Sequence, residues 1–308
     1  MPMILCCGEA LIDMLPRETP GGEHAFAPYP GGAVFNTALA LGRLGTPVGF
    51  FSGLSTDLFG QQLAEALEAS DVDVALAARS DRPTTLAFVR LVSGQASYAF
   101  YDENTAGRLL APSDLPELPE GIGTLFFGGI SLVNEPAAAT YEALMAREAA
   151  RRVTMLDPNI RPGFVRDEAG YRARIGRMIA LADIVKLSDE DLHWLEGPGD
   201  LLALARGILA RGPRLVLVTE GARGAQAVTA TQARRRGAVA VTVADTVGAG
   251  DTFNAGALAA LHEAGVLTKA ALAALPDEAL DAALSLGTRA AAVTVSRPGA
   301  NPPWADEL

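Results

Sequence analysis

Short apolar runs alternate with longer segments of helical periodicity along most of this chain. The apolar runs have the length and β-branched content of buried strands, and they predict strands at Met3–Cys7, Val48–Ser52, Thr124–Phe127, Val153–Leu156, Ile184–Leu187 and Leu215–Thr219. The apolar spacing elsewhere predicts helices over residues 33–44, 58–69, 136–152, 249–263, 269–275 and 277–295. Strands that alternate with helices are joined by right-handed crossovers, so the pattern predicts an α/β fold in which helices cover both faces of a mostly parallel sheet.

Two stretches depart from this alternation. Two short β-rich runs flank Ser93-Gly94-Gln95, which is typical of a hairpin turn. Earlier in the chain, Pro16–Pro30 is polar and rich in Pro and Gly. Folds of this class bind ligands at the carboxyl edge of the sheet, and both stretches are candidates to cover that edge. We therefore expect a single domain over residues 1–308, with a β lid from about 14–30 and 84–105.

The composition limits the kinds of partner. The formal net charge is -11, whereas a nucleic-acid partner requires a basic face, and the short run Arg234–Arg236 is typical of a solvated turn. The longest charge-free stretch, residues 24–42, contains Pro28 and is not a membrane span. The two cysteines, Cys6 and Cys7, are neighbours on a predicted strand and point to opposite faces, so they should not form a disulfide. With no signal-peptide pattern, we expect a cytoplasmic protein without nucleic-acid or membrane partners.

The segment with the strongest chemical signal is Asp245-Thr-Val-Gly-Ala-Gly-Asp251. A strand is predicted before it, over Ala238–Val243, and a helix begins within it. Gly248 and Gly250 allow the backbone to approach a ligand closely. The first amides of a helix have no partner within the helix and lie at the positive end of its dipole, so this turn favours an anion.

A carboxylate, Asp251, lies inside this predicted anion site. The usual phosphate loops do not match, because neither Lys186 nor Lys269 follows a Gly and Phe253 stands where a dinucleotide fingerprint needs its third Gly. A carboxylate beside a bound phosphate can accept the proton of an attacking hydroxyl, while backbone amides stabilise the transferred group. The alternative is an Asp that only stabilises the helix dipole; the two preceding glycines favour the catalytic role.

This segment and the run Pro30-Gly-Gly-Ala-Val-Phe-Asn-Thr-Ala-Leu-Ala-Leu-Gly-Arg-Leu-Gly45 resemble the two signatures of the ribokinase-like, or PfkB, carbohydrate kinases, and the order of elements is similar along the whole chain. The resemblance implies a three-layer α/β/α fold with a small β lid and transfer of a phosphoryl group from ATP to a sugar hydroxyl. It implies that Asp251 is the base. The residues that it places around the anion hole and the sugar are Gly248, Ala249 and Gly250, and Asp13, Gly31, Gly32 and Asn36.

The resemblance also implies a nucleotide site. Its loop would be Thr219-Glu-Gly-Ala-Arg-Gly224, with Thr219, Gly221 and Gly224 against ATP and with Lys186 and Ser188 nearby. Many members carry Asn-x-x-Glu, which helps to organise Mg²⁺; the matching run here is Ser188-Asp-Glu-Asp191, so Asp191 would act on the metal directly or indirectly, with Glu190 as the alternative. Asp245 matches a ligand position for K⁺, but Pro303 stands where other members have Ser, so potassium dependence stays open.

The sugar is less constrained than the reaction. Asp157-Pro-Asn-Ile-Arg161 resembles both fructokinases and 2-keto-3-deoxygluconate kinases, so Arg161 is a candidate sugar contact and Arg90 a second one. Phe100 or Tyr101 could cover the apolar face of the sugar. Contacts with hydroxyl groups favour D-fructose, converted to fructose 6-phosphate, over the acidic sugar.

Three alternatives remain at this stage: another sugar kinase of the family, a sugar or nucleotide sensor without catalysis, and a dehydrogenase. The intact Gly-Ala-Gly-Asp run argues against a sensor, and the missing third Gly argues against a dehydrogenase. The alternating apolar residues of the predicted lid hairpin predict a homodimer formed through the lid, because a small sheet cannot bury both of its faces alone.

Overall fold

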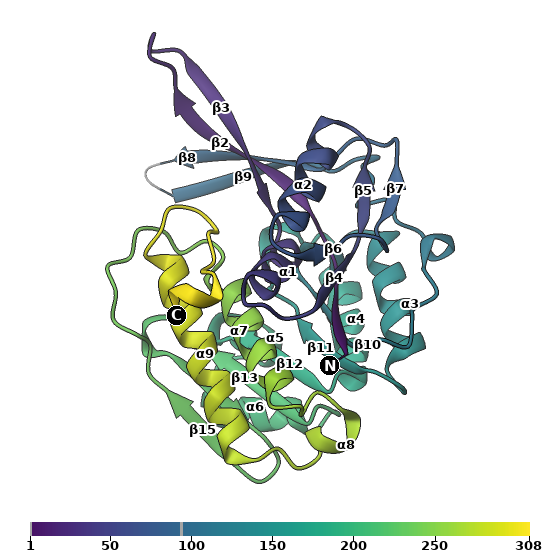
Figure 1. Cartoon of the computed structure of the whole chain (residues 1–308), viewed down its shortest axis with the longest axis vertical. Coiled ribbons are helices and arrows are strands. Elements are labelled where there is room, and N and C mark those ends of the chain that lie inside the picture. The colour runs from purple at the N-terminus through teal and green to yellow at the C-terminus, as the bar shows by residue number, and fades with distance from the viewer. Residues whose placement is uncertain (1, 93–94) are drawn as a thin grey trace.

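The body of the protein is built on one large, mostly parallel sheet (Figure 1). The computed structural model describes residues 2–92 and 95–308, and for residues 90–92 and 95–98 it describes the backbone alone. In this part of the chain the large sheet has the strand order β15-β14-β13-β12-β11-β10-β1-β4-β6. All neighbours from β13 to β6 pair in parallel, whereas β14 and β15 are antiparallel. The strands are β1 (Met3–Cys7), β4 (Val48–Phe51), β6 (Val72–Asp73), β10 (Ile122–Gly128), β11 (Val153–Asp157), β12 (Ile184–Ser188), β13 (Leu215–Thr219), β14 (Ala225–Val228) and β15 (Ala233–Arg236).

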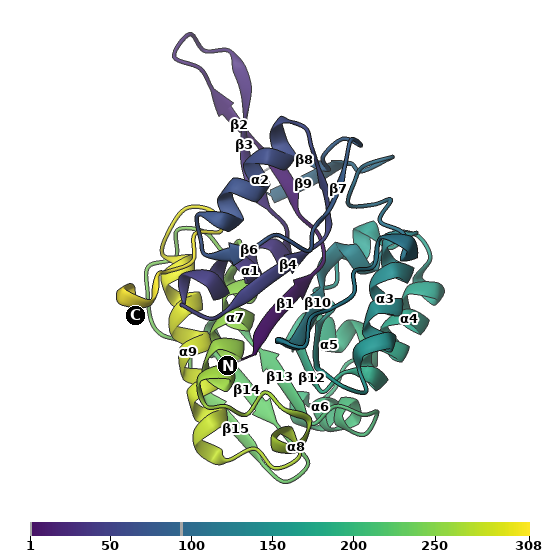
Figure 2. The ribbon, with the colours of Figure 1, turned by 45° about the vertical axis from the view of Figure 1, so that its right-hand side comes forward.

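Helices cover both faces of this sheet (Figure 2). One core contains Cys6 and packs against α1 (Ala33–Arg43), α2 (Leu58–Glu68), α7 (Ala249–Glu263), α8 (Lys269–Leu272) and α9 (Asp277–Val295). The other contains Cys7 and packs against α3 (Ala137–Glu148), α4 (Glu168–Leu181), α5 (Asp189–Glu196) and α6 (Leu201–Leu209). The three-layer prediction is therefore confirmed, and the two cysteines point to opposite faces as free thiols.

A second, small sheet lies beyond the carboxyl edge of the large one (Figures 1 and 2). Its strands are β2 (Leu11–Glu18), β3 (His24–Gly31), β8 (Leu86–Val92) and β9 (Gln95–Tyr101), in the order β3-β2-β8-β9. Most of the Pro/Gly-rich stretch Pro16–Pro30 forms the β2–β3 hairpin, which projects from the body. Pro28 and Pro30 are tolerated because β3 is an edge strand, and Pro16 lies in β2 beyond the residues that pair with β8, Ile12–Met14. The predicted turn residues Ser93 and Gly94 lie outside the described residues.

The strand predicted over Ala238–Val243 is wrong. After β15 ends at Arg236, residues 237–243 belong to no helix or strand. The alternating valines Val239, Val241 and Val243 are exposed. Their spacing is typical of a strand, but the chain here leaves the sheet edge and runs to the end of α9, where Val295 O accepts the amide of Ala244 at 2.8 Å. The Gly-rich turn is therefore positioned by α9 rather than by a preceding strand.

Among the described residues, no helix has the length and apolarity that a membrane span requires. A short parallel pair, β5 (Gly53–Ser55) and β7 (Ala78–Ser80), completes the strands of this part of the chain. Short 3-10 segments join several of these elements, and two of them reach the site: Gly129–Leu132, after β10, and Pro162–Phe164, after β11.

Candidate active site

A cavity of about 370 Å³ lies between the carboxyl edge of the large sheet, the small sheet and the start of α7. Parallel strands bring their carboxyl ends to one edge, so the segments that follow β1, β10 and β11 meet there. The cavity brings together nine of the residues predicted for the site, which are Asp13, Gly32, Asn36, Phe100, Arg161, Gly248, Ala249, Gly250 and Asp251.

Asp251 lies in the first turn of α7, at the wall of this cavity, and only 7% of its surface is exposed. Asn36 Nδ2 in α1 donates a hydrogen bond to Asp251 Oδ2 at 2.9 Å. Burial raises the pKa of Asp251 to about 7, and the hydrogen bond from Asn36 limits that increase. A carboxyl group with a pKa near neutrality is suited to accept a proton at physiological pH.

The turn before Asp251 provides a site for an anion. Gly248 precedes α7 with a φ of 79°, a left-handed conformation that favours glycine. A Cβ on Gly248 would lie 2.8 Å from the Cβ of Ala300, so this position also has no room for a side chain. The amides of Gly250 and Asp251 belong to the first helical turn, where no carbonyl of the same helix can accept them. Gly250 and Asp251 both line the cavity.

Asp13, in β2, lines the opposite side of the cavity. Burial raises its pKa to about 6. Gly31 does not line the cavity itself but lies beside this carboxylate, because a Cβ on Gly31 would be 2.3 Å from Asp13 Oδ2. Gly32 has a φ of 113° and forms the turn into α1, which carries Asn36 into the cavity. The Gly-Gly pair therefore allows Asp13 and Asn36 to approach the same space.

Phe100, on β9, is the lid aromatic that lines the cavity, together with Arg161 and Phe164 from the segment after β11. The rings of Phe100 and Phe164 meet edge to face, with centroids 4.6 Å apart. Tyr101, the alternative to Phe100, points to the opposite face of the small sheet and is 63% exposed. The side chain of Arg90 lies outside the described residues, so its predicted role stays a prediction.

Lys186 lies behind the anion site rather than in the cavity wall. Its Nζ donates to Asp157 Oδ2 at 3.0 Å, and a Cβ on Gly250 would lie 3.2 Å from this Nζ. Burial disfavours the charge of Lys186, but the nearby carboxylates of Asp157 and Asp191 raise its pKa, so it stays protonated. Asn254 Nδ2 also donates to Asp157 at 2.7 Å. A buried positive charge thus lies directly beneath the Gly-rich turn.

Asp191 is committed to backbone contacts. Its Oδ1 accepts the amide of Ile160 at 2.9 Å and its Oδ2 accepts that of Ser188 at 3.3 Å, while Ser188 Oγ accepts the amide of Asp191 in return. This reciprocal pair caps α5. Across the described part of the chain, no group of three or more His, Cys, Asp or Glu side chains is arranged to hold a metal ion. A metal held directly by several protein carboxylates therefore does not fit this site.

The other residues predicted for ATP and K⁺ lie outside the cavity lining. Thr219 ends β13, and Gly221 and Gly224 form the turn into β14 with φ values of 54° and 97°. Asp245 Oδ1 accepts the amide of Val247 at 3.1 Å, and its Oδ2 accepts that of Gly299 at 3.0 Å. Asp245 therefore ties the Gly-rich turn to the segment after α9.

Several residues of the cavity were not predicted. Glu9, just after β1, accepts the amide of Ala33 at the start of α1 through Oε1 at 2.9 Å and the amide of Ser131 through Oε2 at 3.2 Å. Burial raises the pKa of Glu9, and these hydrogen bonds, which lower it, only partly offset that increase. A charged residue directly after a buried strand was a usable signal for Glu9. Asn159 and Thr246 stand within the segments Asp157–Arg161 and Asp245–Asp251, which the sequence had already singled out, whereas Ile130 carried no signal because only the fold brings it to the cavity.

A model of the pfkB family carbohydrate kinases matches residues 1–307. The chain belongs to this family. A fructokinase from Rhizobium leguminosarum bv. trifolii is 56% identical to this carbohydrate kinase over 278 residues, which cover 90% of this chain and 85% of the relative. The structure of a fructokinase with bound ATP from Xylella fastidiosa is similar at a TM-score of 0.89 and 30% identity, and covers 97% of this chain and 93% of the other.

A fructokinase double mutant from Vibrio cholerae, in its fructose, ADP and potassium ion bound form, is similar to this carbohydrate kinase at a TM-score of 0.85 and 27% identity, over 97% of this chain and 94% of the other. The comparisons confirm the predictions of a ribokinase-like fold and of a carbohydrate kinase whose relatives include fructokinases.

Proposed function

We propose that this carbohydrate kinase transfers the γ-phosphoryl group of ATP to D-fructose and forms fructose 6-phosphate. The observation that carries the proposal is that Asp251, the amides of the Gly-rich turn and the polar groups Asp13 and Asn36 all border one cavity. The identity to a fructokinase, 56%, supports fructose as the sugar. The acidic sugar 2-keto-3-deoxygluconate remains the alternative, because Arg161 lines the same cavity.

In the proposed reaction, Asp251 accepts the proton of the fructose hydroxyl as that oxygen attacks the γ-phosphorus. The bond from the γ-phosphorus to the bridging oxygen breaks, and ADP leaves with the bonding electrons. The amides of Ala249, Gly250 and Asp251 would donate hydrogen bonds to the oxygens of the transferred group. Lys186, beneath Gly250, adds a fixed positive charge behind those amides. Asn36 orients the Asp251 carboxylate through its 2.9 Å hydrogen bond.

The sugar would lie between the two sheets. Asp13 and Asn36 would bind its hydroxyl groups, Gly31 and Gly32 leave space for those side chains, and Phe100 would cover its apolar face. Arg161 would contact the end of the sugar away from Asp251. We propose that residues 1–308 are a single kinase domain in which the small sheet is the lid over this site.

The nucleotide would extend from the Gly-rich turn to the β13–β14 turn, with Thr219, Gly221 and Gly224 against ATP and with Ser188 nearby. Mg²⁺ would be bound mainly by the phosphates of ATP, with Asp191 acting through water, because both oxygens of Asp191 already accept backbone amides. The metal would neutralise charge on the phosphates. Each carboxylate oxygen of Asp245 already accepts one backbone amide, which leaves at most one lone pair on each oxygen for K⁺. A K⁺ site there would be shared with the segment after α9.

We further propose that two copies associate through the small sheet. Phe26, Phe88 and Tyr101 form a row of edge-to-face rings on the face that points away from the cavity, with centroids 5.0 and 5.4 Å apart. Phe26 and Tyr101 are 46% and 63% exposed. A second copy that packed against this row would remove the three rings from water. Contiguous exposed aromatic groups are typical of protein–protein interfaces.

The test of the proposed activity is ADP release from ATP and Mg²⁺ with a panel of sugars, in which D-fructose and 2-keto-3-deoxygluconate are compared at equal concentrations. A kcat/KM that is highest for D-fructose, together with fructose 6-phosphate as the product, supports the proposal. A preference for the acidic sugar would replace the substrate and leave the chemistry intact. Absence of turnover with every sugar would contradict the proposed function.

A further inference from the structure

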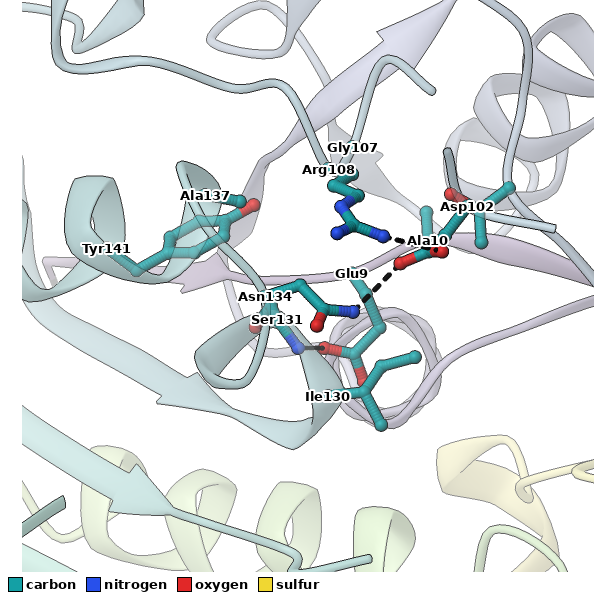
Figure 3. Close-up of a pocket in the computed structure, with 11 residues that line it drawn as sticks. Glu9, Ala10, Asp102, Gly107, Arg108, Ile130, Ser131, Asn134, Ala137 and Tyr141 are labelled. Atoms are coloured by element: carbon teal, nitrogen blue, oxygen red, sulfur yellow. Dashed lines mark hydrogen bonds and ion pairs between the residues drawn. The ribbon is translucent and has the colours of Figure 1, made fainter. Parts of the chain in front are cut away.

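A second, smaller cavity of about 40 Å³ lies where the small sheet joins the body (Figure 3). Glu9 and Ile130 line both this cavity and the larger one, so they form part of the partition between them. The remaining wall includes Asp102, Arg108 and Asn134. These side chains therefore adjoin the proposed sugar site through a shared wall that includes Glu9 and Ile130.

Asp102 is the first residue after β9 and fastens this strand to the body. Its Oδ1 accepts Arg108 Nη1 at 2.9 Å, and its Oδ2 accepts Asn134 Nδ2 at 2.8 Å, as the dashed lines in Figure 3 show. Its carbonyl also accepts the hydroxyl of Thr105 at 2.9 Å. Only 19% of the Asp102 side chain is exposed, so water competes weakly for these bonds.

Asn134 connects this attachment to the floor of the sugar site. It follows the 3-10 turn Gly129–Leu132, in which the amide of Ser131 donates to Glu9 Oε2. The other oxygen of Glu9 accepts the amide of Ala33 at the start of α1, the helix whose Asn36 contacts Asp251. These hydrogen bonds, together with the backbone between Ser131 and Asn134, connect the end of β9 to the helix that orients the proposed base.

We infer that Asp102 is a positioning residue for the sugar. By holding Asn134, it fixes the distance between β9 and the floor of the larger cavity and so places Phe100 over that cavity. Phe100 lies on β9 two residues before Asp102 and lines the larger cavity, so the attachment at Asp102 is close in the chain to the side chain that it would position. The bond to Asn134 is the step that joins the small sheet to the cavity floor, whereas the bond to Arg108 stays within the segment that follows β9. This inference rests on the proposed function, because it assumes that the cavity holds the sugar.

The variant that separates these two contacts is Asn134→Ala, which removes the bond to the body and leaves the Asp102–Arg108 ion pair. We expect KM for D-fructose to rise about tenfold, as for loss of a hydrogen bond to a charged group, and KM for ATP to stay within about twofold. Hydrogen exchange of the β9 amides, residues 95–101, should become faster. The matched control is Gln232→Ala, which also removes an amide donor. It breaks the 3.0 Å bond to the carbonyl of Leu275, lies outside the lining of both cavities and should change neither quantity.

The inference would be overturned if a folded Asn134→Ala protein showed an unchanged KM for D-fructose and unchanged hydrogen exchange in β9. It would also be overturned if the variant lost thermal stability without either of these effects. If Asn134→Ala does not fold, Asn134→Leu keeps most of the side-chain volume but has no donor for Asp102, and it must show the same rise in KM. If the wild-type protein phosphorylates no sugar, the proposed function fails. The exchange measurement then still decides whether Asn134 holds β9, and normal exchange in the variant would refute that attachment.

Discussion

The substitution Asp251→Asn should make the protein more stable while it removes the proposed base. Asp251 is 7% exposed, and burial raises its pKa from the ordinary value of 3.8 to about 7. Because the pKa is raised, the folded state binds the proton more tightly than the unfolded state, and stability is lost as the pH rises through the folded value of about 7. An Asn side chain cannot ionise, and its amide oxygen can still accept the hydrogen bond from Asn36.

The magnitude follows from the pKa difference. A change from 3.8 to about 7 corresponds to on the order of 4 kcal/mol of unfolding free energy once the pH exceeds both values. Part of this effect is already present at pH 5, so the stability advantage of Asp251→Asn over the wild type should grow by roughly 2–3 kcal/mol between pH 5 and pH 8 and then level off.

Urea unfolding of both proteins at several pH values and at one protein concentration measures this difference. The matched control is Asp57→Asn. Burial acts against ionisation of Asp57, but hydrogen bonds from Thr84 and Gly60 outweigh it and lower the pKa, so this substitution should destabilise the protein above pH 5. An Asp251→Asn protein that is equally or less stable than the wild type at pH 8 would refute the reasoning.

Three further predictions concern the sugar site and the small sheet. Asp13→Ala should raise KM for D-fructose about tenfold to a hundredfold with little effect on KM for ATP, since a charged hydrogen bond contributes about 1.5–3 kcal/mol; steady-state kinetics with each substrate varied would expose an unchanged sugar KM. Gly31→Ala should raise the same KM with little change in thermal stability, because its Cβ would displace the Asp13 carboxylate that lies 2.3 Å away. Tyr101→Ala should weaken the dimer, as measured by light scattering, and leave KM for D-fructose unchanged. Phe100→Ala should raise KM for D-fructose and leave the dimer intact. Equal effects of both variants on KM would contradict the assignment of the two faces.

Six of the strands in the large sheet, and their succession along the chain, could be predicted from the sequence because each is a short apolar run bounded by polar residues. β1 and β13 begin and end at the predicted residues. The valines of residues 238–243 show the limit of this signal, since alternation predicts a strand only where a neighbouring strand is available to pair with it. The Pro/Gly-rich stretch Pro16–Pro30 carried no strand signal, because prolines are rare in central strands; the structure places Pro28 and Pro30 in β3, an edge strand, where they are tolerated.

The candidate site, like the large sheet, could be predicted where its residues stand in segments with a local sequence signal. Asp251 and Asn36 stand in segments with local signals, a Gly-rich turn and a Gly-Gly helix start, and the structure brings them within 2.9 Å of each other. Glu9 and Asn134 depend instead on contacts between distant segments, which no local pattern encodes. Asp191 carried a local signal, but its spacing from Ser188 fits a helix cap, and the structure uses it in that way.

The account depends most on Asp251 as the group that takes the proton from D-fructose, and the pH dependence of kcat/KM for D-fructose tests this directly. For the wild type, kcat/KM should rise with pH and level off above about 7, as Asp251 loses its proton in the free enzyme. Asp13, with a pKa of about 6, adds to the fall at low pH, so the Asp13→Asn variant should keep only the inflection near 7. Asp251→Asn should be about a hundredfold to ten-thousandfold slower and lack that inflection. A wild-type profile that is flat from pH 5 to 8, or an Asp251→Asn enzyme of near wild-type rate, would contradict the mechanism.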